Sequence, residues 1–304
     1  SRIPFFINGN LKNITGKNWG HFWNDWLDDT NKRVKKQLKT IQSVPTTTTK
    51  EVTTDGYSAF GAAISPNAKW LAYRDSKMDQ RPGIYIIHLE TNKELRIEDQ
   101  LLGSSLSFTP DSQFLIYSSA RRLGLYHNFS DLRAYHLESK TLSWLTESAR
   151  AKDPHVSSDG KKIVFEKNIS GTTSLALANL SYDSSNNSLS IDNPDVIFQP
   201  NIFARVSHPR FHPNNKKIIF GFHNGETFQE NLVEFEIDSK KLNTLVENGK
   251  FNRFPAFSPS GDLYFISDLS GVDNLYLYQK NKKHKQVTNF TTGAWFPSFH
   301  PKKN

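Results

Sequence analysis

Short runs of apolar residues alternate with polar turns along most of the chain, and the pattern recurs at a nearly constant distance. Each copy is marked by an aromatic or aliphatic residue, a small or polar residue, proline and a turn residue, as in Phe108-Thr109-Pro110-Asp111. Self-similarity at a fixed period is typical of a repeat architecture. The proline position falls at residues 66, 110, 158, 213, 259 and 301, with Ser158 in the third copy, so the spacings are 44, 48, 55, 46 and 42.

Two apolar runs follow each turn, and a polar segment separates them. The first run is rich in β-branched and aromatic residues, which predicts a buried strand, and its copies lie at 70–73, 114–117, 163–165, 218–220 and 263–266. The second run lies at 84–87, 132–137, 175–178, 232–235 and 275–278. A short further strand follows in copies such as 142–146. Four antiparallel strands per repeat predict an all-β fold, a β-propeller of four-stranded blades.

Proline has two positions in the repeat. In the turn it fixes the backbone for the second position of a type I turn, and Asp, Asn or Gly tolerates the next corner. A second proline lies four residues before this position in four copies, at Pro154, Pro209, Pro255 and Pro297. Because proline cannot donate a hydrogen bond inside a sheet, it predicts the start of the innermost strand of each blade.

The fifth copy resembles a known repeat. Residues 257–271, with the Ser258-Pro259-Ser260-Gly261 turn and the Ser267-Asp268-Leu269-Ser270-Gly271 loop, followed by Asn274-Leu275-Tyr276-Leu277-Tyr278, resemble the WD40-like (PD40) repeat of TolB-type propellers. The resemblance covers about residues 55–304. It implies six blades, a periplasmic or otherwise extracytoplasmic location, and a protein or peptide partner.

The sixth copy has its first strand alone, because the chain stops soon after residues 294–301. A propeller closes when one chain end completes the last blade, since an open edge leaves backbone groups unpaired. The β-prone residues 46–53 are the candidate for an outer closing strand. Two alternatives remain open: the natural chain continues for roughly another 30 residues, or a five-bladed ring closes by overlap.

Residues 18–42 have helical periodicity, and we divide the chain into a helical segment, 1–45, and the propeller, 46–304. Asn18 or Thr15 can cap the helix, and acidic residues precede basic ones as the helix dipole favours. Its apolar positions are Trp19, Phe22, Trp23, Trp26, Leu27, Val34, Leu38 and Ile41. They predict a helix docked on the propeller or on an upstream domain, with a membrane-surface helix as the alternative.

Residues 13–27 also resemble the closing helices of gluzincin-type metallopeptidase domains. That resemblance implies a zinc site upstream of Ser1, in a longer protein of which this chain is the C-terminal propeller. The chain begins without an initiator Met or a signal segment, which fits a processed chain or a piece of a longer one.

Composition narrows the function classes. The formal net charge of +8 resides in the two ends, since residues 1–50 carry nine Lys or Arg against three Asp and residues 280–304 carry six Lys and no acid. Basic ends around a mildly acidic middle do not line up cations as a nucleic-acid groove requires, so we expect no nucleic-acid partner. The chain has no cysteine, which excludes disulfides, thiolate metal sites and cysteine nucleophiles. No apolar run is long enough to form a transmembrane segment, while peripheral association with the cell envelope stays compatible.

Motifs for catalysis are not found: the sequence has no His-Glu-x-x-His, Gly-x-Ser-x-Gly or phosphate-binding glycine loop, and we expect no cofactor. Residues before the second proline should face the central channel, where loops meet a ligand. The candidate partner-binding residues are Asp153, His208, Arg253, Phe254, Trp295 and Phe296. Alternatively, these aromatic residues pack between blades. His208 and His212, four residues apart, are weak metal candidates, although His212 and His300 occupy the turn position where a backbone hydrogen bond suffices.

Three functions therefore compete. The first is a non-catalytic protein- or peptide-binding propeller of the bacterial cell envelope, a TolB-like scaffold or accessory module. The second is an accessory propeller of a metallopeptidase whose catalytic domain lies outside this chain. The third is a metal-dependent sugar lyase or hydrolase that acts in the propeller funnel.

Overall fold

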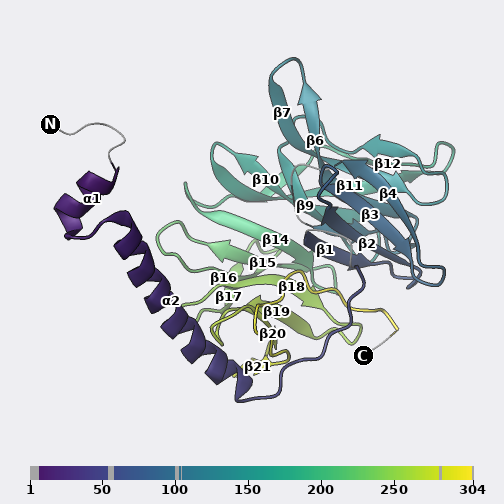
Figure 1. Cartoon of the computed structure of the whole chain (residues 1–304). Coiled ribbons are helices and arrows are strands. Elements are labelled where there is room, and N and C mark those ends of the chain that lie inside the picture. The colour runs from purple at the N-terminus through teal and green to yellow at the C-terminus, as the bar shows by residue number, and fades with distance from the viewer. Residues whose placement is uncertain (1–6, 54–57, 100–102, 104, 281–282, 303–304) are drawn as a thin grey trace. The chain divides into compact units, whose positions relative to one another are not determined.

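The structure, a computed structural model, describes residues 7–53, 58–99, 103, 105–280 and 283–302 (Figure 1). It divides the chain into two compact units. One unit comprises residues 1–48 with 289–291, and the other comprises residues 49–288 with 292–304.

The first unit contains two helices, α1 (Ile7–Thr15) and α2 (Trp19–Gln42). The predicted helix and its cap are confirmed, because the Asn18 side chain accepts a hydrogen bond from the His21 N–H at 2.9 Å. Helix α1 was not predicted, since its sequence is short and has few apolar residues. Beyond α2 the chain meets its own C-terminal part: the Thr47 N–H donates to the Asn289 carbonyl at 3.0 Å.

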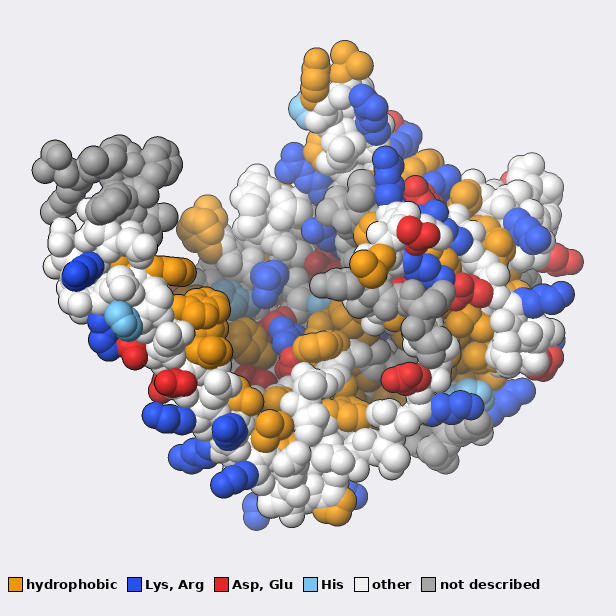
Figure 2. All heavy atoms as spheres, viewed as in Figure 1, with side chains coloured by type: hydrophobic (Ala, Val, Ile, Leu, Met, Phe, Trp, Pro, Cys, Tyr) orange, Lys and Arg blue, Asp and Glu red, His pale blue; other side chains and the backbone are white. Residues whose placement is uncertain are grey.

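Helix α2 separates apolar from charged side chains. In Figure 2 hydrophobic side chains gather along one side of α2 and Lys and Arg side chains along the other. Three tryptophans form a row on this helix, with ring centroids 6.4 Å apart for Trp19 and Trp23 and 4.9 Å apart for Trp23 and Trp26. In the described part of the chain neither helix has the length and apolar character needed to cross a bilayer.

The second unit is a ring of antiparallel blades, which confirms the predicted all-β propeller (Figure 1). Three blades are simple four-stranded sheets: β1 (Ser58–Ile64), β2 (Trp70–Ser76), β3 (Gly83–His88) and β4 (Lys93–Asp99); β5 (Leu106–Phe108), β6 (Phe114–Leu123), β7 (His127–His136) and β8 (Leu142–Trp144); and β18 (Asn252–Phe257), β19 (Leu263–Ser267), β20 (Asn274–Leu277) and β21 (Lys285–Gln286). A further blade comprises β14 (Arg205–Phe211), β15 (Lys217–His223), β16 (Asn231–Glu236) and β17 (Leu242–Val246).

The third blade explains the longest repeat spacing. It comprises β9 (Ala151–Val156), β10 (Lys162–Ile169), the long β11 (Thr172–Asp183) and β13 (Asp195–Phe198). The outer half of β11 pairs with an additional strand, β12 (Ser188–Ile191), and among the described residues no other blade has such an inserted hairpin. The chain then returns to β11 as β13, which fills the place of a fourth strand.

A bulge interrupts most inner strands just before the second proline. Five residues at this position adopt positive φ: Gly61 (65°), Asp153 (50°), His208 (50°), Phe254 (53°) and Phe296 (54°). The strand pairing shifts register at the bulge in β1, β9, β14 and β18. The prolines therefore lie in the middle of β9, β14 and β18 rather than at strand starts as predicted, because a bulge leaves a residue out of the ladder and removes the need for its N–H.

The ring closes at the sixth copy through one segment, residues 292–302, in which the structure assigns no strand. On one side the Ala294 N–H donates to the Asp273 carbonyl of the fifth blade at 2.9 Å. On the other side the Ile64 N–H of β1 donates to the Ser298 hydroxyl at 3.2 Å. Residues 46–53 form no strand, so the predicted outer closing strand is wrong. The physical reason is that the described sixth copy offers no strand ladder for such a segment to join.

Apolar side chains fill the space between blades and hold the ring. One cluster joins the second and third blades and includes the fully buried Ile116, Leu132, Ile163 and Phe165. The turn after each inner strand is fixed locally: for example, the Phe114 N–H donates to the Thr109 hydroxyl at 3.0 Å. Burial on both faces of each blade places the inner strands at fixed positions around a central channel.

Candidate functional site

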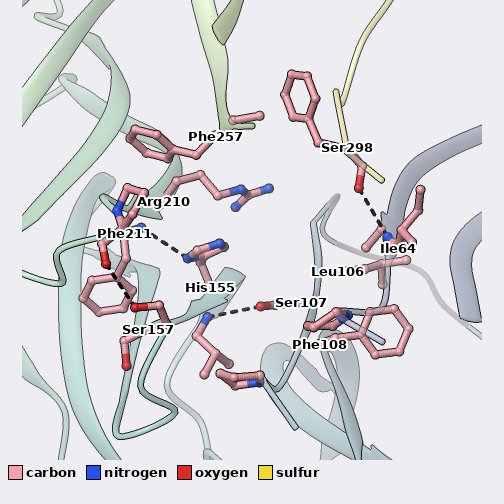
Figure 3. Close-up of a pocket in the computed structure, with 18 of the residues that line it drawn as sticks. Ile64, Leu106, Ser107, Phe108, His155, Ser157, Arg210, Phe211, Phe257 and Ser298 are labelled. Carbon is pink, nitrogen blue, oxygen red and sulfur yellow. Dashed lines mark hydrogen bonds between the residues drawn. The ribbon is translucent and has the colours of Figure 1, made fainter. Parts of the chain in front are cut away.

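A cavity of about 460 Å³ opens at one end of the channel, where the inner strands end (Figure 3). All six copies of the repeat contribute to its wall. The innermost ring of side chains comes from the position three residues before the turn proline: Ala63, Ser107, His155, Arg210, Ala256 and Ser298. The next position adds an apolar layer made of Ile64, Phe108, Val156, Phe211, Phe257 and Phe299. A volume in this range suits a small ligand or a few residues of peptide.

Hydrogen bonds between neighbouring copies fix the polar members of this ring. The Val156 N–H donates to the Ser107 hydroxyl at 3.1 Å, and the Phe211 N–H donates to His155 Nδ1 at 3.2 Å. Ser298 makes the equivalent contact across the closing point. Each bond runs from the backbone of one copy to a side chain of the copy before it, so the wall is rigid and preorganised.

His155 and Arg210 are the two large polar residues of the ring. Burial, together with the nearby Arg210 charge, holds the pKa of His155 well below its ordinary value. The imidazole is therefore neutral at pH 7, and since Nδ1 accepts a hydrogen bond, the ring proton lies on Nε2. In Figure 3 the Arg210 guanidinium extends past His155 into the cavity.

A layer of charged groups lies behind Arg210, around Ser105. Arg210 Nη2 donates to the Ser105 hydroxyl at 3.1 Å, and the Ser105 N–H donates to Asp153 Oδ1 at 2.5 Å. Asp153 also shares a hydrogen bond with Glu166, whose Oε1 accepts the His208 N–H at 2.7 Å. Burial and the Asp153 charge raise the pKa of Glu166 well above its ordinary value.

Replacing Glu166 with glutamine should make the protein less sensitive to rising pH. The folded-state pKa is raised, so between about pH 4.3, where the unfolded chain releases this proton, and the higher folded pKa, wild-type stability falls by up to about 1.4 kcal/mol per pH unit. Glutamine keeps an acceptor for the His208 N–H and a donor toward Asp153. Melting temperatures measured across pH should show the variant gaining on wild type as pH rises, and Glu90→Gln, at an exposed turn, should show no gain. Parallel curves for Glu166→Gln and wild type would contradict the raised pKa of Glu166.

Of the candidate residues before the second proline, Asp153 belongs to this charged layer, and the three aromatic ones lie together outside the wall of the large cavity. His208, Phe254 and Phe296 form an aromatic cluster, with ring centroids 4.2 Å apart for His208 and Phe254 and 4.3 Å apart for Phe254 and Phe296. The ring centroids of Phe60 and Phe296 lie 6.1 Å apart. A second, small cavity is lined by Arg210, Phe254 and Phe296 among others. These aromatic residues come from different copies of the repeat and pack against one another.

Arg253 and Trp295 meet at a different point, the side chain of Asp273. Arg253 forms an ion pair with Asp273 Oδ2 at 2.9 Å, and Trp295 Nε1–H donates to the same oxygen at 2.5 Å. Trp295 is 54% exposed. These two residues join the fifth blade to the closing segment, so a structural role accounts for their contacts.

His208 and His212, the weak metal candidates, contact different partners. The His208 ring packs in the aromatic cluster. The His212 ring packs on Phe257, with ring centroids 5.1 Å apart, and its Nδ1 accepts a hydrogen bond from the Asn214 N–H at 3.2 Å. The bulge at His208 changes which side successive residues face, so residues four apart do not share a side here. Among the described residues no three His, Asp or Glu side chains come together as a metal site.

Sequence reasoning missed His155 and Arg210 as site residues. A signal for them was available, because counting three residues back from each turn proline selects the six side chains of the cavity ring. The residue before the second proline lies at the bulge and does not line the large cavity.

The fold and the cavity define the class of protein, a TolB-like β-propeller. No protein-family model matches the chain. TolB, a Tol-Pal system protein of Francisella tularensis subsp. mediasiatica, is 24% identical over 196 residues, which cover 64% of this chain and 42% of that protein. The chain thus spans about two fifths of the length of the curated relatives it matches.

Solved structures give the same fold. TolB from Acinetobacter baumannii has a TM-score of 0.58 at 19% identity, over 81% of this chain and 58% of that one. A protein of Agrobacterium tumefaciens solved as a TolB has a TM-score of 0.57 at 15% identity, over 80% of this chain and 86% of that one. Puromycin hydrolase also matches, with a TM-score of 0.57 at 14% identity over 80% of this chain and 41% of the enzyme.

Proposed function

We propose that this protein is a non-catalytic, TolB-like scaffold of the bacterial cell envelope, outside the cytoplasm, that binds a protein or peptide partner at the open end of its channel. The observation that carries the proposal is the cavity to which all six copies of the repeat contribute. The similarity to TolB of the Tol-Pal system supports the cell-envelope role and the partner class.

The geometry of the cavity favours binding over catalysis. Its innermost ring is mostly small, with Ala63, Ser107, Ala256 and Ser298, so a peptide segment can enter. Phe257 and Phe299 provide apolar wall, and exposed Pro213 lies at the rim. Ser107 and Ser298 accept backbone hydrogen bonds, and within the described part of the chain neither hydroxyl donates to a His, Asp or Glu side chain that could activate it as a nucleophile.

Site-specific photo-crosslinking tests this function in cells. A photoreactive phenylalanine analogue at position 213, on the cavity rim, should give a discrete crosslink to one cell-envelope protein. The matched control is position 186, equally exposed but at the tip of the β11–β12 hairpin, where no such product should form. If position 213 gives no discrete product, or gives the same products as position 186, the cavity is not the partner site.

A second candidate function is an accessory propeller of a hydrolase, which the similarity to puromycin hydrolase favours. The gluzincin resemblance of residues 13–27 points the same way and stays a prediction. In that case the photoreactive residue at position 213 should label a catalytic domain, identified by mass spectrometry, rather than an envelope protein without enzyme motifs.

A further inference from the structure

We propose that the cavity recognises a carboxylate group on a peptide segment of the partner, and that Arg210 and His155 hold this group. The inference rests on the proposed function and adds the chemistry of what the channel end binds.

Two donors from neighbouring blades point into the same space. Arg210 lies on β14 and His155 on β9, at equivalent positions of the ring, and Figure 3 shows their side chains together at the cavity. His155 Nδ1 is occupied as an acceptor, so its Nε2–H is the hydrogen that faces outward from that contact. Arg210 uses one nitrogen toward the Pro209 carbonyl at 2.9 Å and one toward Ser105, which leaves further N–H groups of the fork for a ligand.

The charge of Arg210 is not cancelled by an ion pair. Within the described part of the chain no carboxylate lies within 4.0 Å of its guanidinium. Asp153 and Glu166 act on it from a greater distance, and burial and the Asp153 charge raise the pKa of Glu166, which favours its uncharged form. Cations that are partly removed from water are normally paired, so the open side of the half-buried Arg210 favours an anion from outside.

The residues that line the cavity favour a carboxylate over other anions. Phe211, Phe257 and Phe299 surround the donors with apolar surface, and the innermost ring offers the single guanidinium of Arg210. One guanidinium and one neutral imidazole N–H match the single charge and two oxygens of a carboxylate, whereas a phosphate dianion would need more cations. The carboxylate can belong to an acidic side chain or to a chain terminus, and either would carry apolar atoms that contact the phenylalanines.

Calorimetric titration with three short peptides tests the proposal and separates the two sources. The probes are acetyl-Gln-Phe with a free C-terminal carboxylate, acetyl-Glu-Phe-amide with a side-chain carboxylate, and acetyl-Gln-Phe-amide with neither. At least one carboxylate peptide should bind about 10- to 100-fold more tightly than the neutral amide, as expected for charge-assisted hydrogen bonds. The stronger of the two identifies the source.

Arg210→Gln should abolish this preference, so that all three peptides bind like the neutral amide. Arg205→Gln is the matched control, because Arg205 lies on the same strand but is exposed and outside the cavity wall. Unchanged binding of the neutral amide and an unchanged thermal unfolding midpoint show that Arg210→Gln is folded. Arg210→Lys should retain part of the preference, since it keeps the charge but not the planar fork.

The proposal is overturned if neither carboxylate peptide binds, if the neutral amide binds equally well, or if Arg205→Gln loses as much affinity as Arg210→Gln. Competition by inorganic phosphate at the same concentration would also overturn it, in favour of a general anion site. The in-cell crosslink at position 213 is independent of these titrations. A crosslink at position 213 without a preference for carboxylate peptides would support the partner function and reject carboxylate recognition. A preference for carboxylate peptides without a crosslink would support carboxylate recognition and reject the partner function.

Discussion

Asp131→Ala is expected to lower the free energy of unfolding by about 3 to 5 kcal/mol. Asp131 is fully buried on β7, where its carboxylate accepts hydrogen bonds from the Thr146 hydroxyl at 2.8 Å, the Ala149 N–H at 2.8 Å and the Ser148 N–H at 2.9 Å. These donors belong to the segment that leads from the second blade to the third. Alanine would leave three donors without an acceptor at the junction of two blades.

Urea denaturation measures this loss, and Asp183→Ala is its control. Asp183 also accepts three hydrogen bonds, two from Ser185 and one from Asn186, but it lies exposed at a hairpin tip where water replaces the lost partner. The control should therefore change stability far less. Equal losses for the two variants would show that the Asp131 contacts do not hold the blades together.

The second large effect is a loss of stability in acid that depends on His208. Burial lowers the pKa of His208 to about 4, against the effect of Asp153 and with further lowering by Arg210, Arg253 and Arg205. The unfolded chain takes up this proton near pH 6.5, so native stability falls between about pH 6.5 and 4, by up to about 3 kcal/mol in total.

His208→Asn isolates this contribution, because asparagine does not titrate and tolerates the φ of 50° at this position. The variant loses ring contacts and is less stable at neutral pH, but its stability should fall less than that of wild type between pH 6.5 and 4. His127→Asn, an exposed histidine at the tip of the β6–β7 hairpin, should follow wild type. Equal acid losses in wild type and His208→Asn would contradict the lowered pKa.

The fold follows from sequence wherever the period controls it. Apolar runs such as 70–73 and 218–220 lie in β2 and β15 because alternating burial between blades requires β-branched and aromatic side chains there. The turn could also be predicted, since Ser, Thr and His at this position accept hydrogen bonds from the local backbone, as Thr109 and His212 do. Features without a period were not predictable: helix α1, the inserted strand β12, and the failure of residues 46–53 to form a strand.

Only part of the site could be predicted, because it depends on a backbone conformation that sequence alone does not reveal. A left-handed residue is readily predicted where glycine occurs, as at Gly61, but His208, Phe254 and Phe296 adopt the same φ without that signal. The bulge reverses which residues face the open end of the channel. His155 and Arg210 therefore reach the cavity, and the residues before the prolines form the cluster behind it.

The most direct test of partner binding at the channel end is the yield of the photo-crosslink at position 213 in an Arg210→Gln background. If the channel end binds a partner through a carboxylate, the yield should fall about 10-fold or more relative to wild type, while Arg205→Gln leaves it unchanged. An undiminished crosslink yield in Arg210→Gln cells would contradict binding of the partner through a carboxylate.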